Sequence, residues 1–478
     1  MSMNLLIERI LEGVGTFFLL YLMGYATFLF ASVIGGATYL YKRRRMYLLK
    51  NELKHQYYFP VSIVVPAYNE EVTVVDTVRS LLNLEYRLYE IIVVDDGSKD
   101  ETTKVMVDAF QMHRVDRPIR LTIPCKKVVE IWECESEKVK ITLIKKENGG
   151  KGDAINMGIN ASEFPYFVCM DADSFLQKDS LEKIVQPLME DQSVIAVGGL
   201  IRISQCAVFE NGVVKKFKLP WNIVQCMQIM EYERSFLASR IFLDSFNGNL
   251  IISGAFGLFK KDMVVAVGGY DTNTLGEDME LIVKLHVFCR NNKIKYSIRY
   301  APNAICWSQA PFTIGDLSKQ RRRWHLGLFQ SMMKYRQIGL NPRFGLLGFL
   351  SYPYYWLYEL FSAFIELFGL ITVILSGVLG LINVPFMILF FLLYALYSAV
   401  MTITAFFLRI YTQSLEISFG DAIKAIIMCL LEGVTFRFLL TFIRITAFIG
   451  YRKKKNKWGE IKREKQFKDK ENDLAPKP

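Results

Sequence analysis

The chain has 478 residues, of which 52% are hydrophobic and 14% aromatic, and its formal net charge is +11. So large an apolar share is high for a water-soluble enzyme and indicates membrane segments. Residues 42–54 hold six Lys/Arg against one acid, and residues 451–478 hold eleven against five, which accounts for the whole positive excess. Basic residues beside apolar segments favour an anionic membrane surface, so we expect no nucleic acid partner. Eight cysteines without a CxxC pair and four scattered histidines argue against a zinc site or a disulfide framework.

The first apolar segment predicts a single membrane span. No residue from Gly13 to Tyr41 is charged, and a helix needs about 20 apolar residues to cross a bilayer. The segment is too long for the core of a signal peptide. The basic run at 42–45 places its C-terminal end in the cytoplasm by the positive-inside rule. We therefore expect residues 1–45 to form an N-terminal helix and transmembrane span, followed by cytoplasmic chain.

Residues 46–325 are expected to form one cytoplasmic α/β domain. Between residues 60 and 320, short β-branched runs alternate with helical patterns, which is typical of βαβ units around a mostly parallel sheet. The runs VSIVVPAYNEE, YEIIVVDDGS and YFVCMDADSF each end in polar residues. Ligands of open α/β sheets bind beyond the carboxyl ends of the strands, so these endings should converge on one site. The stretch 113–140 breaks the alternation and is interpreted as an insertion.

Residues 326–450 are expected to form interfacial and transmembrane helices. The segment 367–408 has no charge and a breaker, SGVLGLINVP, near its middle, which leaves room for two spans. Residues 425–450 are apolar but carry three charges, and two of these, Arg437 and Arg444, lie seven apart on one helix face. An amphipathic helix on the membrane surface fits them at least as well as a third crossing. Two C-terminal spans would return the basic tail to the cytoplasm.

Acidic and basic residues follow several predicted strands. Asp171 and Asp173 form a D-x-D arrangement whose carboxylates can both reach a hard cation, Mg²⁺ or Mn²⁺, although an ordinary acidic turn gives the same pattern. Asp95 and Asp96 are placed to accept hydrogen bonds from a base or ribose, or to cap a helix. Lys151 follows two glycines and offers a point charge for phosphate, without the spacing of a P-loop.

Glu277 and Asp278 begin a predicted amphipathic helix, EDMELIVKLHVF. Acids in a first turn suit the helix dipole without any function, but a carboxylate that faces a sugar there can act as a general base. Since consecutive helix residues point about 100° apart, we expect that only one of the two acids can face a bound substrate well. Further on, QRRRWH (320–325) precedes the apolar C-terminal part. A basic membrane anchor would need only the positive charges, so Gln320 and Trp324 call for another explanation. We assign Arg321 and Arg322 to contact with anionic lipid.

In chain order, PAYNEE, DDGS, GGKGDAIN, DAD, SGAFGLF, GED and QRRRW resemble the motifs of family 2 glycosyltransferases, inverting nucleotide-sugar enzymes with a GT-A fold. The resemblance covers about residues 60–325. QxxRW, at Gln320, Arg323 and Trp324, narrows it to the processive membrane synthases that make cellulose, mixed-linkage β-glucan, poly-N-acetylglucosamine, chitin or hyaluronan. The implied architecture is a cytoplasmic GT-A (Rossmann-like) domain inserted between transmembrane and interfacial α-helices.

The resemblance also implies a role for each matched residue. Asp278 matches the aspartate of the family's TED motif, the general base, with Glu277 as the competitor; the threonine of that motif is Gly276 here. The implied donor-binding residues are Tyr68, Glu70, Asp95, Asp96, Lys151, Asp171 and Arg323, the acceptor-binding residues are Ser253, Gly254, Gln320 and Trp324, and the metal ligands are Asp173 and Asp171.

The implied function is a processive hexosyltransferase that polymerises a β-linked polysaccharide from a UDP-sugar and moves it across the membrane. We expect UDP-glucose and a β-glucan, with poly-N-acetylglucosamine, hyaluronan or single transfer to a lipid as alternatives. The expected cofactor is Mg²⁺ or Mn²⁺. The expected partners are the UDP-sugar, the growing polysaccharide and the bilayer, and a homo-oligomer with a shared channel is left open. The resemblance implies a multi-pass protein of the bacterial plasma membrane.

Overall fold

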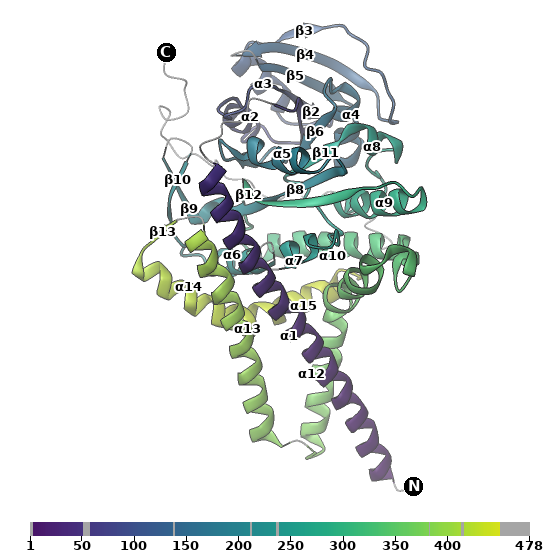
Figure 1. Cartoon of the computed structure of the whole chain (residues 1–478), viewed down its shortest axis with the longest axis vertical. Coiled ribbons are helices and arrows are strands. Elements are labelled where there is room, and N and C mark those ends of the chain that lie inside the picture. Colours follow the sequence, from purple (N-terminus) through teal and green to yellow (C-terminus); the bar gives the residue numbers. More distant parts are fainter. Residues whose placement is uncertain are drawn as a thin grey trace.

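The computed structural model describes residues 3–50, 58–136, 139–210, 213–235, 239–381, 383–412 and 415–449. Its upper part is an α/β domain, and its lower part consists of long helices that project from that domain (Figure 1). Helix α1 (Met3–Lys50) runs along the molecule from the lower end to the side of the α/β domain (Figure 1). The basic tail predicted at 451–478 lies outside the described residues.

The centre of the α/β domain is a ten-stranded mixed sheet of order β3-β4-β5-β2-β1-β6-β11-β8-β12-β7. Strands β5, β2, β1 and β6 pair in parallel, as do β8 and β12, whereas β11, β7, β4 and β3 pair antiparallel to their neighbours. The predicted α/β class is therefore confirmed. The strand bounds are β1 Val61–Ala67, β2 Tyr89–Asp95, β3 His113–Val115, β4 Val128–Ser136, β5 Val139–Lys146, β6 Tyr166–Cys169, β7 Phe175–Leu176, β8 Val194–Ile203, β11 Gly257–Lys260 and β12 Ser297–Ser308.

Helices cover both faces of this sheet. Ile63 and Val65 of β1 belong to one apolar cluster and Val64 to another, because successive side chains of a strand point to opposite faces. A Cβ atom on Gly158 of α4 would lie 2.2 Å from Cγ1 of Val64, so glycine lets α4 approach β1 closely. The helices of the domain are α2 Val74–Leu82, α3 Thr102–Phe110, α4 Lys151–Ala161, α5 Ser180–Glu190, α6 Ile223–Arg234, α7 Arg240–Asp244, α8 Lys261–Ala266, α9 Glu277–Asn291 and α10 Ile314–Lys334.

The stretch 113–140, predicted as an insertion, supplies the antiparallel edge of the sheet. Its strands β3 and β4 pair with each other, and β4 pairs with β5. A second, three-stranded sheet of β9 (Ala207–Glu210), β10 (Val213–Phe217) and β13 (Glu416–Ile417) joins the α/β domain to the C-terminal helices. Neither feature contributes to the candidate site described below.

Among the residues that the structure describes, two helices are long and apolar enough to cross a membrane: Arg9–Lys42 and Val384–Tyr411. The pair Leu347–Leu360 and Ser362–Val378, bent by 51°, would be a third span if it crosses as one unit. The turn between α12, which ends at Val378, and α13, which begins at Val384, falls in the segment SGVLGLINVP that was predicted to separate two spans. The remaining C-terminal elements are η5 Leu347–Ser351, α11 Tyr352–Tyr354, η6 Tyr355–Leu360, α12 Ser362–Val378, α13 Val384–Thr412, α14 Phe419–Leu431, η7 Glu432–Phe436 and α15 Arg437–Thr446, of which η5, η6 and η7 are π-helical.

Helices α14 and α15 lie across the long axis of the molecule, near the point where α1 and α13 meet the α/β domain (Figure 1). The exposed residues of α14 include Ile423, Ile427 and Leu430. An apolar face on a helix that runs across the membrane helices is the arrangement expected of an interfacial helix.

Candidate active site

A cavity of about 410 Å³ lies between the α/β domain and the membrane-side helices. It collects residues from the end of β6, the first turns of α4 and α9, the segment before β11, and α10. The sequence-predicted site residues that line it are Lys151, Asp171, Asp173, Ser253, Gly254, Glu277, Asp278, Gln320, Arg323 and Trp324.

The two acids at the start of α9 both line this cavity. Glu277 is buried, and its Oε1 lies 3.6 Å from Nζ of Lys151. Asp278 is only partly buried, and its Oδ2 accepts a hydrogen bond from the backbone N–H of Gly254 at 3.2 Å. Both acids therefore line the cavity, and which of them faces the substrate stays a prediction.

Burial and charge distinguish Glu277 from its neighbour. Burial raises the pKa of Glu277, the charge of Lys151 lowers it, and the charge of Asp278 raises it again, with a net increase above the usual value. A carboxylate that is buried and paired with a lysine is poorly placed to meet an acceptor sugar. Asp278 is the more accessible of the two acids.

Lys151, the first residue of α4, holds one acid of the D-x-D pair. Its Nζ lies 2.5 Å from Oδ1 of Asp171, whose side chain is 32% exposed. Burial lowers the pKa of Lys151, but the charges of Asp171 and Glu277 outweigh this effect and raise the pKa above its usual value. The lysine is therefore a fixed positive charge at the wall of the cavity.

The D-x-D pair fits a hard divalent cation. Asp171 and Asp173 follow β6 and line the same cavity, and carboxylate oxygens are the ligands that Mg²⁺ and Mn²⁺ prefer. Within the described part of the chain no group of three or more His, Cys, Asp or Glu side chains is arranged to hold a metal. Mg²⁺ is commonly held by one or two carboxylates together with phosphate and water. These two residues meet that requirement only when a diphosphate is present.

Asp96, predicted to contact the nucleotide, has both carboxylate oxygens occupied. Its Oδ1 accepts hydrogen bonds from Nζ of Lys146 and, at 3.0 Å, from the N–H of Gly149. Its Oδ2 accepts from the N–H of Gly150 at 2.7 Å. Asp96 thus fixes the glycine loop that precedes Lys151. Direct contact of this residue with a base stays a prediction.

The other predicted donor residues, Tyr68, Glu70 and Asp95, do not line the cavity. Ala67 of β1 pairs in register with Asp95 of β2, so the polar residues that follow these two strands are neighbours. Oδ1 of Asp95 accepts from the N–H of Ser98 at 2.8 Å. The ends of β1 and β2 therefore lie side by side. Convergence of all three strand ends on one site, and a role of these residues toward the base, stay predictions.

Helix α10 carries QRRRWH, and its arginines have different partners. Arg321 is buried and donates two hydrogen bonds to Glu231 of α6, at 2.9 and 2.5 Å. Its guanidinium carbon lies 4.6 Å from the ring centroid of Trp324. The assignment of Arg321 to lipid contact is wrong, because a buried bidentate pair with a carboxylate satisfies its charge inside the protein. Arg322 donates to Oγ1 of Thr446 at 3.1 Å, which ties α10 to α15.

His325, the last residue of that stretch, is neutral. Burial and the charge of Arg444 together lower its pKa to about 3. Burial is the larger cause, and the arginine that contributes comes from α15.

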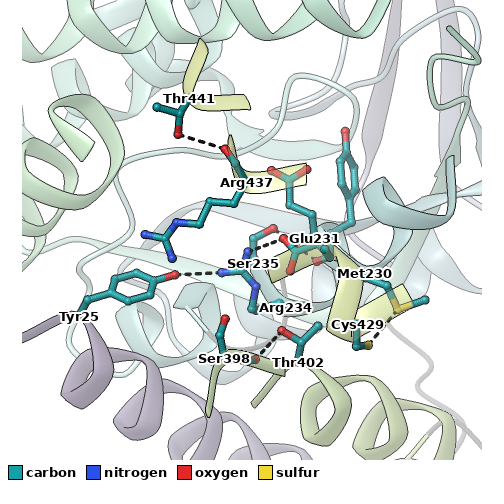
Figure 2. A network of polar contacts seen from close by, with 12 residues as sticks. Tyr25, Met230, Glu231, Arg234, Ser235, Ser398, Thr402, Cys429, Arg437 and Thr441 are labelled. Atoms are coloured by element: carbon teal, nitrogen blue, oxygen red, sulfur yellow. Dashed lines mark hydrogen bonds and ion pairs between the residues drawn. The ribbon is translucent and has the colours of Figure 1, made fainter. Parts of the chain in front are cut away.

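The cavity continues on the membrane side, where it is lined by charged residues that the sequence did not single out as site residues. Arg234 of α6 donates to the hydroxyl of Tyr25 of α1 at 3.1 Å and to Oε1 of Glu432 at 3.1 Å. Arg437 pairs with Glu366 of α12, Nη2 to Oε1, at 2.6 Å. Figure 2 shows the side chains of Tyr25, Arg234 and Arg437 close together. The signal in the sequence for Glu432 and Arg437 is a charge within an apolar segment, a pattern that also fits a helix on the membrane surface.

A mixed sheet whose strand ends carry a D-x-D pair, beside a helix that begins with two acids, defines the GT-A class of nucleotide-sugar transferases. Residues 62–264 match the family described as glycosyl transferase family 2, and residues 166–407 match glycosyl transferase family group 2. The chain belongs to the family 2 glycosyltransferases. The family inferred from the ordered motifs is confirmed.

Two curated relatives carry the same name. The chain is 32% identical over 291 residues to the poly-β-1,6-N-acetyl-D-glucosamine synthase of Staphylococcus epidermidis, which covers 61% of this chain and 59% of the relative. It is 29% identical over 274 residues to the synthase of that name from Staphylococcus aureus strain COL, covering 57% and 56%. The match thus spans less than two thirds of either relative. These relatives do not support the expected β-glucan and instead favour the poly-N-acetylglucosamine alternative.

A solved structure supports the fold. The chain is similar to a mannosyltransferase from Pyrobaculum calidifontis in complex with GDP-mannose and Mn²⁺, with a TM-score of 0.51, 18% identity, and coverage of 87% of this chain and 99% of that one. At this identity the likeness establishes the GT-A architecture. The predicted fold class is confirmed.

Proposed function

We propose that this chain is a processive inverting glycosyltransferase that polymerises N-acetylglucosamine from UDP-N-acetylglucosamine into a β-1,6-linked polysaccharide. The observation that carries the proposal is a single cavity that runs from the acids of α9, past Trp324, to polar residues of the membrane-side helices. The names of the two Staphylococcus relatives favour N-acetylglucosamine as the sugar. An enzyme that transfers sugar to a soluble acceptor would not need a cavity that extends to the membrane-side helices.

The donor end has the charges that a nucleotide diphosphate needs. Lys151 and Arg323 supply positive charge at the cavity wall. Asp171 and Asp173 would hold Mg²⁺ or Mn²⁺, which neutralises charge on the departing diphosphate. The mannosyltransferase neighbour was solved with Mn²⁺, which agrees with a divalent cation.

The transfer is a single displacement. Asp278 accepts the proton of an acceptor hydroxyl, and the oxygen of that hydroxyl forms a bond to C1 of the donor sugar. The bond between C1 and the phosphate oxygen breaks, and UDP leaves with its electron pair. Attack from the face opposite the leaving group converts the α-linked donor into a β-linked product. Asp278 suits the role of base because it is ionisable, partly exposed and within the cavity.

The acceptor end is built around Trp324. Its side chain is 39% exposed and lines the cavity, so a sugar ring can stack on one face of the indole. On the protein side, Arg321 lies against the ring and is itself held by Glu231. The paired arginine therefore fixes the orientation of the tryptophan before the acceptor binds.

The membrane-side helices provide the route for the polymer. Tyr354, Tyr355 and Tyr358, from α11 and the π-helical η6, line the cavity. The ion pairs Arg234–Glu432 and Arg437–Glu366 line it as well. Charged groups inside a membrane protein are costly and mark the paths of polar substrates. The tyrosine rings can stack against sugars, and the arginines and glutamates neutralise one another. Such a lining suits a polysaccharide, which is uncharged and rich in hydroxyl groups.

The proposed topology follows from the same arrangement. The catalytic domain, residues 46–325, would lie in the cytoplasm of a bacterial cell, where UDP-sugars are made, and residues 326–450 would form the path through the plasma membrane. The basic run after the first span agrees with this orientation.

The test uses the purified full chain in lipid nanodiscs with Mg²⁺ and one UDP-sugar at a time. UDP release, product length and digestion by linkage-specific hydrolases are measured. We expect long products from UDP-N-acetylglucosamine that a β-1,6-specific hexosaminidase degrades. Polymer from UDP-glucose that only a glucanase degrades, or a product with a single added sugar, would overturn the proposal.

A further inference from the structure

Gly327 of α10 and Gly276, the residue before α9, are in direct backbone contact. A Cβ atom on Gly327 would lie 2.7 Å from both the Cα and the N of Gly276, and one on Gly276 would lie 2.9 Å from the Cα of Gly327. Interiors are close-packed, and backbone atoms cannot swing aside as the end of a side chain can. The backbone of Gly276 has φ −128°, which any residue adopts. Glycine is therefore needed here for room and not for its conformational freedom.

Two further residues of α10 hold the segment that leads into α9. Oε1 of Gln330 accepts hydrogen bonds from the N–H of Leu275 at 2.8 Å and from Oγ1 of Thr274 at 3.0 Å. Nζ of Lys334 lies 2.6 Å from Oε1 of Glu280, in the first turns of α9. The start of α9 is thus fixed to α10 through backbone contact, hydrogen bonds and an ion pair.

The same helix face carries the acceptor motif. Positions 320, 323, 324 and 327 recur at intervals of three and four residues, so they lie along one side of α10. Gln320, Arg323 and Trp324 line the cavity, and Gly327 comes one turn later. One rigid helix therefore bears the predicted acceptor-binding residues and, immediately after them, the contact that locates Asp278.

We propose that Gly327 and Gln330 are positioning residues of the transfer reaction, which set the distance between Asp278 and an acceptor sugar on Trp324. The inference rests on the proposed function. A base must lie within hydrogen-bond reach of the hydroxyl it deprotonates, and a misplacement of about 1 Å can cost about 10²-fold in rate. A Cβ atom at position 327 forces a shift of that size, because the atoms it meets are backbone.

The first test is Gly327→Ala, with Gly315→Ala as the matched control on the same helix. A Cβ atom on Gly315 would meet only Oγ1 of Thr313, at an ordinary 3.7 Å. We expect kcat of Gly327→Ala to fall by about 10- to 100-fold, with KM for the UDP-sugar and UDP affinity near those of the wild type. The melting temperature should fall only modestly, as the added Cβ atom is accommodated by a local shift. Gly315→Ala should match the wild type in all four quantities.

A double-mutant cycle separates positioning from packing. If Gly327→Ala misplaces the base, then Asp278→Asn costs much less in the Gly327→Ala background than in the wild type. Additive losses would overturn the proposal, and so would an unchanged kcat or a parallel fall of kcat, UDP affinity and melting temperature. UDP release is recorded beside polymer. If the wild-type protein released UDP without making polymer, the proposed function would be wrong. The positioning proposal would then be tested by comparing the rates of UDP release of the variants.

Gln330 gives an independent variant should Gly327→Ala not fold. Gln330→Glu keeps an oxygen that accepts from Leu275 and Thr274, whereas Gln330→Ala removes it. We expect Gln330→Ala to lower kcat while UDP affinity is retained, and Gln330→Glu to restore at least half of the lost activity. Equal activity of the two variants would contradict a positioning role for this residue.

Discussion

Nζ of Lys151 lies 2.5 Å from Oδ1 of Asp171, so the more exposed acid of the D-x-D pair is already neutralised by a lysine. A divalent cation and this lysine compete for the same carboxylate. A diphosphate offers the lysine a second anionic partner, which frees Asp171 for the metal. Metal and donor should therefore bind together, and each weakly without the other.

Metal dependence is the first consequence. We expect Asp173→Asn to abolish polymer synthesis and EDTA to do the same to the wild type, because the cation neutralises the leaving diphosphate. Calorimetry should show that Mn²⁺ binds at least tenfold more tightly in the presence of UDP. Lys151→Ala should raise the affinity for Mn²⁺ alone and lower the affinity for UDP. Full turnover in EDTA would remove the metal from the mechanism.

The identity of the base is tested by two isosteric changes. Asp278→Asn keeps the size of the side chain but cannot take a proton, so turnover should fall by about 10²-fold or more while UDP and metal binding persist. Glu277→Gln removes one of the two carboxylates beside the buried Lys151 and should act mainly on donor affinity. Single-turnover rates and UDP titrations distinguish these effects. An active Asp278→Asn with an inactive Glu277→Gln would assign the base to Glu277.

Trp324 is expected to act on the acceptor. Trp324→Ala removes the apolar surface on which a sugar stacks, and polymer synthesis should fall roughly 10- to 100-fold, the equivalent of burying a large apolar side chain. UDP affinity should remain within about twofold. Trp324→Phe, which keeps a ring, should retain part of the activity. Loss of UDP binding in Trp324→Ala would make the residue part of the donor site or of the fold.

Arg321 is expected to matter for stability. Arg321→Gln leaves Glu231 buried without its bidentate partner, and breaking a buried pair in this way costs about 3–5 kcal/mol. The melting temperature of the solubilised chain should drop clearly, and the double variant Arg321→Gln/Glu231→Gln should recover part of the loss. Arg322→Gln, which removes one hydrogen bond to Thr446, is the control with a small effect. Arg321→Gln with wild-type melting would contradict the buried pair.

His286 makes stability depend on pH. Its ring is buried between the hydroxyl of Tyr296 (2.7 Å) and the carbonyl of Asn249 (2.9 Å), and burial lowers its pKa from 6.5 to about 4. The unfolded chain therefore binds the proton first, so stability is complete above pH 6.5 and falls as the pH drops toward 4. The loss from this group is about 3 kcal/mol. Melting curves of His286→Gln should show a flatter pH profile than those of the wild type.

Local patterns in the sequence were sufficient to predict the membrane span and the α/β sheet. The absence of charge from Gly13 to Tyr41 predicts a span whatever the rest of the chain does, and the structure has a helix of that kind there. Alternating strands and helices predict a sheet whose polar strand ends meet, and Ala67 and Asp95 indeed pair in register. Asp171 and Asp173 reach one cavity because their spacing at a strand end is itself local.

Contacts between distant segments were decided by the tertiary structure alone. Arg321 and Glu231 are 90 residues apart, and Arg234 and Glu432 are 198 apart, so no periodicity relates them. An arginine beside an apolar segment has the same sequence pattern whether it faces lipid headgroups or a buried carboxylate. Only the packing of α6, α10 and the membrane-side helices fixes which of the two it meets, because burial removes water and makes a charged partner necessary.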